Sequence, residues 1–152
     1  MATTTTTCPT SDERVTLFAL LLDTNARLTR SFGEVLETSC ALPVAWFDVL
    51  FQLRRAPEGR LKMSQIADAI VHSTGGTTRL IDRLEEAGFV ERHLCPEDRR
   101  AVHVAITEAG NTKLDEALAV HLDYLEGHLS NRLSCDERAL LATLLEKINA
   151  ND

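Results

Sequence analysis

The segment SQIADAIVHSTGGTTRLIDRLEEAG, residues 64–88, decides the fold that we expect for this chain. Its first part places apolar residues at helical spacing after Ser64, a residue type that often caps the start of a helix. After a short turn around His72, Ser73 offers the same kind of cap to a second helix, and Gly88 is a typical C-terminal stop. Two short helices joined by a tight turn predict a helix-turn-helix.

The second helix is predicted to be amphipathic, because Thr77, Leu80, Ile81 and Leu84 recur at the spacing of one helix face. In a helix-turn-helix, the first residues of the second helix face base edges in the major groove, and its backbone N–H groups lie near phosphates. The alternative is that the glycine pair marks a loose turn, with the helix starting at Thr77 and nothing bound. We predict DNA contacts by Ser73, Thr74, Gly75, Gly76, Thr77, Thr78 and Arg79.

Two arginines lie on or near the polar face of this helix. Arg79 falls opposite the apolar stripe, where it can reach a phosphate or a guanine edge, and Arg83 lies one turn further along. The alternative is that both pair along the helix with Asp82, Glu85 or Glu86, as helix charges commonly do. We favour DNA contact for Arg79 and leave Arg83 open.

A β-hairpin is predicted after the second helix. Residues 89–95 and 101–106 have strand character, and a charged turn, Pro96-Glu97-Asp98-Arg99-Arg100, lies between them. Adjacent arginines on a projecting turn suit the negative potential of a minor groove, and Asp98 can orient one of them. The alternative is an ordinary charged turn, in which these residue types are common.

Long helices are predicted on both sides of this region. Thr10 with Glu13, and Ser134 with Glu137, have the spacing of a capping box, and Thr107 can cap the helix that follows the hairpin. Leucines recur every three or four residues from Leu114 to Leu129, close to the pattern of a coiled-coil seam. Residues 1–10, with five consecutive threonines, are predicted to be a disordered tail.

The charge of the chain is unevenly distributed. The 152 residues have a net charge of −7, which by itself disfavours a polyanionic partner. Residues 54–103 hold nine Lys and Arg against eight Asp and Glu, whereas the rest of the chain holds seven against fifteen. The acidic excess therefore lies outside the predicted helix-turn-helix and hairpin. No apolar run suits a membrane span or a signal peptide, so we expect a cytoplasmic protein.

The cysteines and histidines do not form a recognisable site. Cys8, Cys40, Cys95 and Cys135 are scattered singly, without the spacing of a zinc site or a disulfide framework. A small hydrolase or thiol enzyme would be a rival function. However, the sequence has no nucleophile-elbow motif, metal-ligand cluster or phosphate-binding glycine loop. We expect no catalysis, no metal and no cofactor.

Five short motifs between residues 61 and 110 resemble the multiple-antibiotic-resistance regulator (MarR) family. They are MSQIA (63–67), TRLIDRLE (78–85), GFVER (88–92), PEDRR (96–100) and ITEAG (106–110). The resemblance implies a mainly α fold with a small β-hairpin wing, in which a winged helix-turn-helix lobe joins a helical dimerisation region.

The resemblance also implies a division of labour along the chain. Residues 11–40 and 107–150 would form the dimerisation region of a homodimer, and residues 41–106 the DNA-binding lobe. The dimer would bind a pseudo-palindromic operator in duplex DNA. By the family's pattern, Ser73 to Arg79 make the recognition-helix contacts, and Arg100 in the Asp-x-Arg segment of the wing is the better minor-groove candidate. The glycine pair replaces bulkier residues of many relatives.

Relatives commonly release DNA when a small aromatic or carboxylate-bearing effector lodges between the dimer region and the DNA lobe. Trp46, Phe47 and Phe51 lie close to that region, although we favour a core role for them. Two alternatives remain. One is an oxidant-sensing repressor of the same fold that uses a cysteine such as Cys8 or Cys40, and the other is a dimeric interaction module that does not bind DNA.

Overall fold

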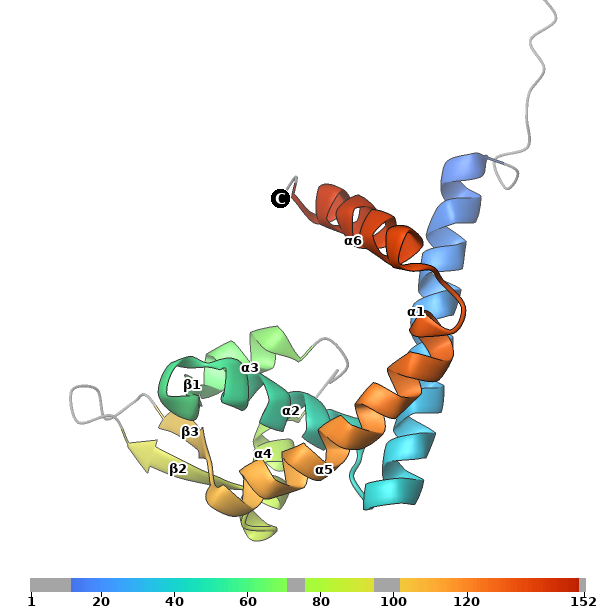
Figure 1. Cartoon of the computed structure of the whole chain (residues 1–152). Helices are drawn as coiled ribbons and strands as arrows, with labels where there is room; N and C mark the ends of the chain where they lie inside the picture. The colour runs from blue at the N-terminus through green and yellow to red at the C-terminus, as the bar shows by residue number, and fades with distance from the viewer. Residues whose placement is uncertain (1–11, 71–75, 95–101, 151–152) are drawn as a thin grey trace, which may run out of the picture.

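The computed structural model describes residues 12–70, 76–94 and 102–150, and it is mainly helical (Figure 1). The predicted fold class, mainly α with a small β-hairpin, is confirmed. The elements in chain order are α1 (Glu13–Cys40), α2 (Val44–Arg55), a 3-10 turn (Pro57–Gly59), β1 (Arg60–Lys62), α3 (Met63–Ala69), α4 (Thr77–Glu86), β2 (Val90–Leu94), β3 (Val102–Ile106), α5 (Glu108–Leu125), a π turn (Glu126–Ser130) and α6 (Cys135–Asn149).

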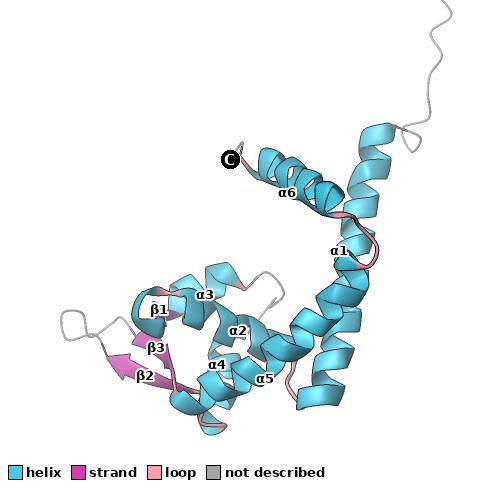
Figure 2. Cartoon of the chain, viewed as in Figure 1, coloured by secondary structure: helices cyan, strands magenta, loops and turns pink. Residues whose placement is uncertain are grey.

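The sheet has three antiparallel strands in the order β1-β3-β2 (Figure 2). The predicted hairpin is β2 and β3, with Val90 opposite Ile106 and Leu94 opposite Val102. Strand β1 pairs with the other edge of β3, and Leu61 lies opposite Val104. Strand β1 was not predicted, because three residues are too few to show an alternating pattern.

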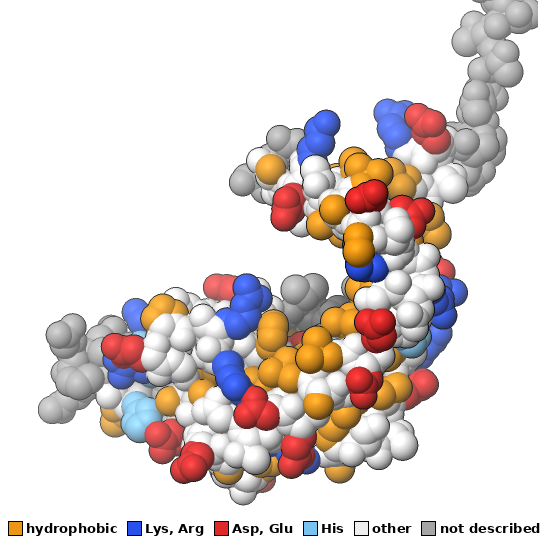
Figure 3. Space-filling model, viewed as in Figure 1, with side chains coloured by type: hydrophobic (Ala, Val, Ile, Leu, Met, Phe, Trp, Pro, Cys, Tyr) orange, Lys and Arg blue, Asp and Glu red, His pale blue; other side chains and the backbone are white. Residues whose placement is uncertain are grey.

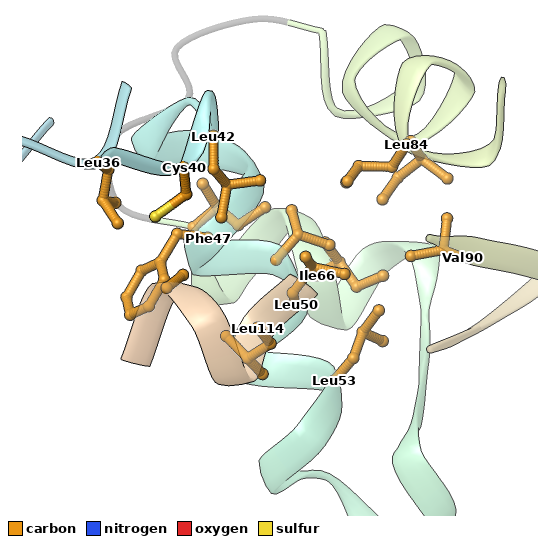
Figure 4. Packing of buried hydrophobic residues seen from close by; sticks show 14 of the residues in the cluster. Leu36, Cys40, Leu42, Phe47, Leu50, Leu53, Ile66, Leu84, Val90 and Leu114 are labelled. Carbon is orange, nitrogen blue, oxygen red and sulfur yellow. The ribbon is translucent and has the colours of Figure 1, made fainter. Parts of the chain in front are cut away.

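Helix α2 lies at the centre of the core and packs against α1, α3, α4, α5 and the sheet. It contributes Phe47, Val49, Leu50 and Leu53, which are at most 3% exposed. Full burial of each such side chain stabilises the fold by about 1.5–3 kcal/mol. Figure 4 shows Phe47, Leu50 and Leu53 among side chains from segments that are distant in sequence. Fully buried partners from the other helices are Leu36, Ile66, Ile81, Leu84 and Leu114.

Two of the predicted helix caps are confirmed. The Thr107 side chain accepts a hydrogen bond from the N–H of Gly110 at 3.0 Å and begins α5. Ser134 and Glu137 form the predicted capping box at the start of α6, in which the Ser134 N–H donates to Glu137 Oε2 at 2.8 Å. Both interactions join residues three apart, so the local sequence is sufficient to specify them.

Two other caps differ from the prediction. Helix α1 begins at Glu13 and is capped by Asp12, whose Oδ1 accepts from the Arg14 N–H at 2.8 Å, whereas Thr10 lies outside the described residues. Helix α3 begins at Met63 with Lys62 in the cap position, so the predicted cap Ser64 is wrong. The reason is tertiary: β1 holds Lys62 in an extended conformation, and the helix begins at the next residue.

Helices α1 and α5 pack together and connect the lobe around the sheet to α6 (Figure 1). The leucines of the predicted seam differ in exposure along α5. Leu114 is fully buried in the chain's own core, whereas Leu122 is 66% exposed. The stripe from Leu114 to Leu129 is therefore not one continuous exposed seam, because its first leucine packs inside the chain. No helix in the described part of the chain is long and apolar enough to cross a membrane.

Candidate nucleic-acid interface

Helix α4 begins at Thr77, later than the predicted cap Ser73 implies. Gly76 occupies the cap position with a φ of 113°, a conformation that favours glycine. The Leu80 N–H donates the first helical hydrogen bond to the Gly76 carbonyl at 2.8 Å. Ser73, Thr74 and Gly75 lie outside the described residues. The alternative start at Thr77 is thus correct, and Gly76 is needed for its backbone conformation.

The exposed face of α4 carries the cationic residues. Ile81 and Leu84 are fully buried, as the apolar stripe predicted, and Arg79, Arg83 and Thr78 are exposed. After the helix ends at Glu86, the left-handed Gly88 reverses the chain direction into β2, which confirms its predicted role.

Arg92 on β2 joins the wing to α4. Its Nη2 lies 2.6 Å from Asp82 Oδ1 and 3.4 Å from the Thr78 carbonyl, and its Nη1 donates to Glu85 Oε2. Its backbone N–H also donates to Glu85 Oε1 at 3.2 Å. Burial acts to lower the pKa of Arg92, but the hydrogen bonds and charges of Asp82 and Glu85 raise it overall, so the cation is held firmly.

These contacts bear on the predicted role of Arg79 and Arg83. The alternative paired these arginines with acidic residues on the same helix, but Asp82 and Glu85 instead bind Arg92. Neither Arg79 nor Arg83 has an ion pair among the described residues. Arg92 was not among the predicted site residues, although three acidic residues within five positions of one helix, Asp82, Glu85 and Glu86, indicate that a basic partner is near.

The hairpin extends from the side of α4. Strand β2 packs against α4, and the last described strand pair before the tip is Leu94 with Val102. The tip, with the predicted site residues Asp98, Arg99 and Arg100, lies outside the described residues. The base of the wing therefore lies beside α4, the helix that carries Arg79 and Arg83, and the contacts of the wing tip stay a prediction.

Comparison with known proteins identifies the family of the chain. Residues 42–101 match a model of the MarR family. Wild-type MarR from E. coli, in its apo form, is 30% identical, with a match that covers 87% of this chain and 95% of that chain at a TM-score of 0.73. This chain belongs to the MarR family. The expectation of a transcriptional regulator rather than an enzyme is thereby confirmed.

Two further matches agree with this assignment. A cysteine-to-serine variant of E. coli MarR, complexed with operator DNA, is 29% identical and has a TM-score of 0.78, with coverage of 93% of this chain and 99% of that chain. The HTH-type transcriptional regulator YkoM of Bacillus subtilis is 36% identical over 89 residues. That match covers 59% of this chain and 57% of YkoM, so it spans little more than half of the relative.

Two helices of this MarR-family chain expose apolar faces. No residue of α6 is buried, and α1 has no buried residue before Phe32. Figure 3 shows hydrophobic side chains gathered on the surface near α6. The exposed apolar residues, each between 36% and 62% exposed, are Val15, Leu17, Phe18, Leu20, Leu22 and Val35 on α1, and Leu140, Leu141, Leu144, Leu145 and Ile148 on α6.

Two adjoining hollows lie between α1 and the end of α5. The first, about 160 Å³, is apolar and is lined by Phe32, Tyr124 and Leu125 among others. The second, about 350 Å³, is lined by Arg27, Arg30, Ser31, Glu34 and Arg132. Both include Leu28 and His128, and His128 belongs to the π turn that follows α5. Such turns often occur at functional sites.

The aromatic residues of α2 belong to the core, as favoured from the sequence. Phe47 is 3% exposed and stacks on Phe51 with ring centroids 5.7 Å apart, and Trp46 meets Phe89 edge to face at 6.1 Å. Among the residues that the structure describes, no group of His, Cys, Asp and Glu is placed to hold a metal ion.

The two cysteines in the described residues differ in exposure. Cys40 is buried and Cys135 is exposed, and both are free thiols. Cys8 and Cys95 lie outside the described residues. Burial of Cys40 makes it a poor target for an oxidant, because reactive thiols need access and a stabilised thiolate.

Proposed function

We propose that this MarR-family regulator is a cytoplasmic, ligand-responsive repressor that binds a pseudo-palindromic operator as a homodimer. Residues Ser73, Thr74, Gly75, Gly76, Thr77, Thr78 and Arg79 would enter the major groove, and Asp98, Arg99 and Arg100 would reach the adjacent minor groove. The observation that carries the proposal is the exposed α4 face, on which Arg79 and Arg83 have no ion-pair partner among the described residues.

The start of α4 suits a phosphate. Gly76 has no side chain to accept hydrogen bonds from the first N–H groups of the helix, and the helix dipole favours an anion there. A DNA phosphate can supply the missing acceptor. Arg79 lies within one turn of that end, so its guanidinium can contact the same strand or a base edge.

The exposed apolar faces support a homodimer. Eleven large side chains of α1 and α6 are more than a third exposed in the single chain, which would be costly for a monomer in water. A second copy can cover both faces by two-fold symmetry, since a closed dimer uses the same surface twice. We assign residues 11–40 and 107–150 to this dimerisation region, residues 41–106 to the DNA-binding lobe, and residues 1–10 to a tail.

Selection of bound duplexes from a random pool tests DNA recognition. We expect an inverted repeat whose half-sites lie about 10 base pairs apart on one face of the duplex. Arg79→Ala should cost about 1–3 kcal/mol, roughly five- to 150-fold in Kd. Arg27→Ala, which removes an exposed arginine of α1, is the matched control and should bind as wild type. Equal binding by both variants would remove Arg79 from the interface.

Sedimentation equilibrium tests the homodimer. Leu144→Glu places a charge in the exposed apolar face of α6 and should shift the protein to monomer. Thr143→Glu lies on the opposite side of α6 and should leave the dimer intact. A monomeric wild-type protein at micromolar concentration would contradict the assignment.

The two hollows support a small effector with an aromatic body and a carboxylate. The apolar hollow offers Phe32 and Tyr124 to the ring, and the second hollow offers three guanidinium groups to the anion. We expect benzoate to weaken operator binding and uncharged benzyl alcohol to have no effect. Arg132→Ala should raise the benzoate concentration needed and leave binding without benzoate unchanged. An identical benzoate response from the variant would place the effector elsewhere.

A further inference from the structure

Helix α4 is acidic when its own residues alone are counted. It has two cations, Arg79 and Arg83, and three anions, Asp82, Glu85 and Glu86, which gives a formal charge of −1. A surface that approaches a polyanion is disfavoured by a negative charge of its own. A helix of this composition therefore needs a further cation close to it if it is to bind DNA.

Arg92 supplies that cation from β2. Its guanidinium contacts Asp82 Oδ1 at 2.6 Å and also bonds Glu85, with the Arg92 side chain only 25% exposed. Adding its charge brings the sum from −1 to zero. Arg92 approaches from the strand beside the helix, so it neutralises the acids without occupying the exposed face of α4.

The position of Asp82 shows what Arg92 prevents. At 3.6 residues per turn, residues three apart are neighbours on a helix, so Asp82 is within reach of Arg79. In the structure its carboxylate instead bonds Arg92, and Arg79 has no ion pair with a described residue. Loss of Arg92 would release Asp82 to pair with Arg79, and would leave Asp82 and Glu85 as uncompensated neighbours.

We propose that Arg92 is a positioning residue for DNA binding, which masks the charges of Asp82 and Glu85 and thereby keeps Arg79 and Arg83 available to the phosphate backbone. This inference rests on the proposed function, because it assumes that the exposed face of α4 meets DNA. It adds a role for a residue that does not itself touch the nucleic acid.

The first measurement compares Arg92→Gln with wild type on the selected operator. We expect the variant to bind about tenfold or more weakly, comparable to the loss of one specific contact. The slope of log affinity against log salt should fall by about 0.9 if one phosphate contact is lost. Circular dichroism and thermal unfolding of the variant establish how much of its folded structure remains.

The decisive measurement is a rescue. The triple variant R92Q/D82N/E85Q also lacks the ion pairs of Arg92, but its acids are neutral, so we expect affinity to return to within about threefold of wild type. The control R92Q/E37Q/D123N has the same net charge but neutralises two exposed acids of α1 and α5. This control should bind as weakly as R92Q.

The affinities of these variants for the operator support or overturn the masking role of Arg92. Rescue by the triple variant alone supports charge masking. A triple variant no better than R92Q, an equal rescue by the control, or wild-type affinity of R92Q overturns it. If the wild-type protein itself selects no duplex, the proposed function fails instead, so the two failures are distinguishable.

Discussion

Substitution of Gly110 tests how closely the start of α5 packs against Phe89 and the end of β3. A Cβ at this position would lie 2.1 Å from the Phe89 carbonyl oxygen and 2.9 Å from Ile106 Cγ1. An unstrained carbon to oxygen contact is about 3.3 Å or longer, so the backbone must move by roughly 1 Å. That backbone is held by hydrogen bonds, because the Thr107 N–H donates to the same Phe89 carbonyl at 3.0 Å.

We therefore expect Gly110→Ala to destabilise the protein by about 1–3 kcal/mol, the usual cost of overpacking. For a chain of this size the midpoint of thermal unfolding should fall by about 2–12 °C. Gly127→Ala is the matched control, since a Cβ there meets nothing within 4 Å. Its midpoint should stay unchanged or rise slightly through better helix propensity.

Differential scanning calorimetry of both variants, at the same protein concentration, provides the measurement. Protein concentration must be matched because the proposed dimer would gain stability by mass action. If Gly110→Ala unfolds at the temperature of Gly127→Ala, the close approach between α5 and Phe89 does not constrain the fold, and the argument is refuted.

Three further predictions concern stability. Burial lowers the pKa of His121, so the unfolded chain binds a proton at this side chain more readily than the folded chain does. The stability of the wild-type protein should therefore fall as the pH drops below about 6.5. His121→Phe should remove that part of the pH dependence in urea titrations between pH 5 and 8. Thr107→Val loses the cap on Gly110 and the 2.7 Å bond to the Gly88 carbonyl, and should cost about 1–2 kcal/mol in the same assay, with a smaller loss counting against the cap. Leu50→Ala empties a fully buried site of α2 and should cost about 2–5 kcal/mol in chemical denaturation, whereas a loss below 1 kcal/mol would contradict its central place in the core.

The helix-turn-helix, the hairpin and the capped helix starts at Thr107 and Ser134 could be predicted because they depend on local patterns. The stripe on α4 identifies its buried face, since helical spacing alone decides which side chains share a side. The capping box at Ser134 was predictable for the same reason: its partners lie one helical turn apart.

Errors arose where distant segments compete with local preference. Ser64 is a good cap by residue type, but pairing of β1 with β3 fixes Lys62 in an extended conformation and moves the helix start. Leu114 fits a coiled-coil seam, but α2 packs on α5 and buries that leucine inside the chain. A one-dimensional pattern gives the face of a helix but cannot say which partner covers it.

The sequence by itself predicted the helix-turn-helix and the hairpin. It also indicated that Gly76 and Arg79 lie near the start of the second helix. Only the tertiary structure decided that Arg92, ten residues after Asp82, turns back to bind it and leaves Arg79 without an ion pair among the described residues. The physical reason is that ionic contacts depend on separations of a few ångströms between side chains, and these separations are set by the packing of β2 against α4.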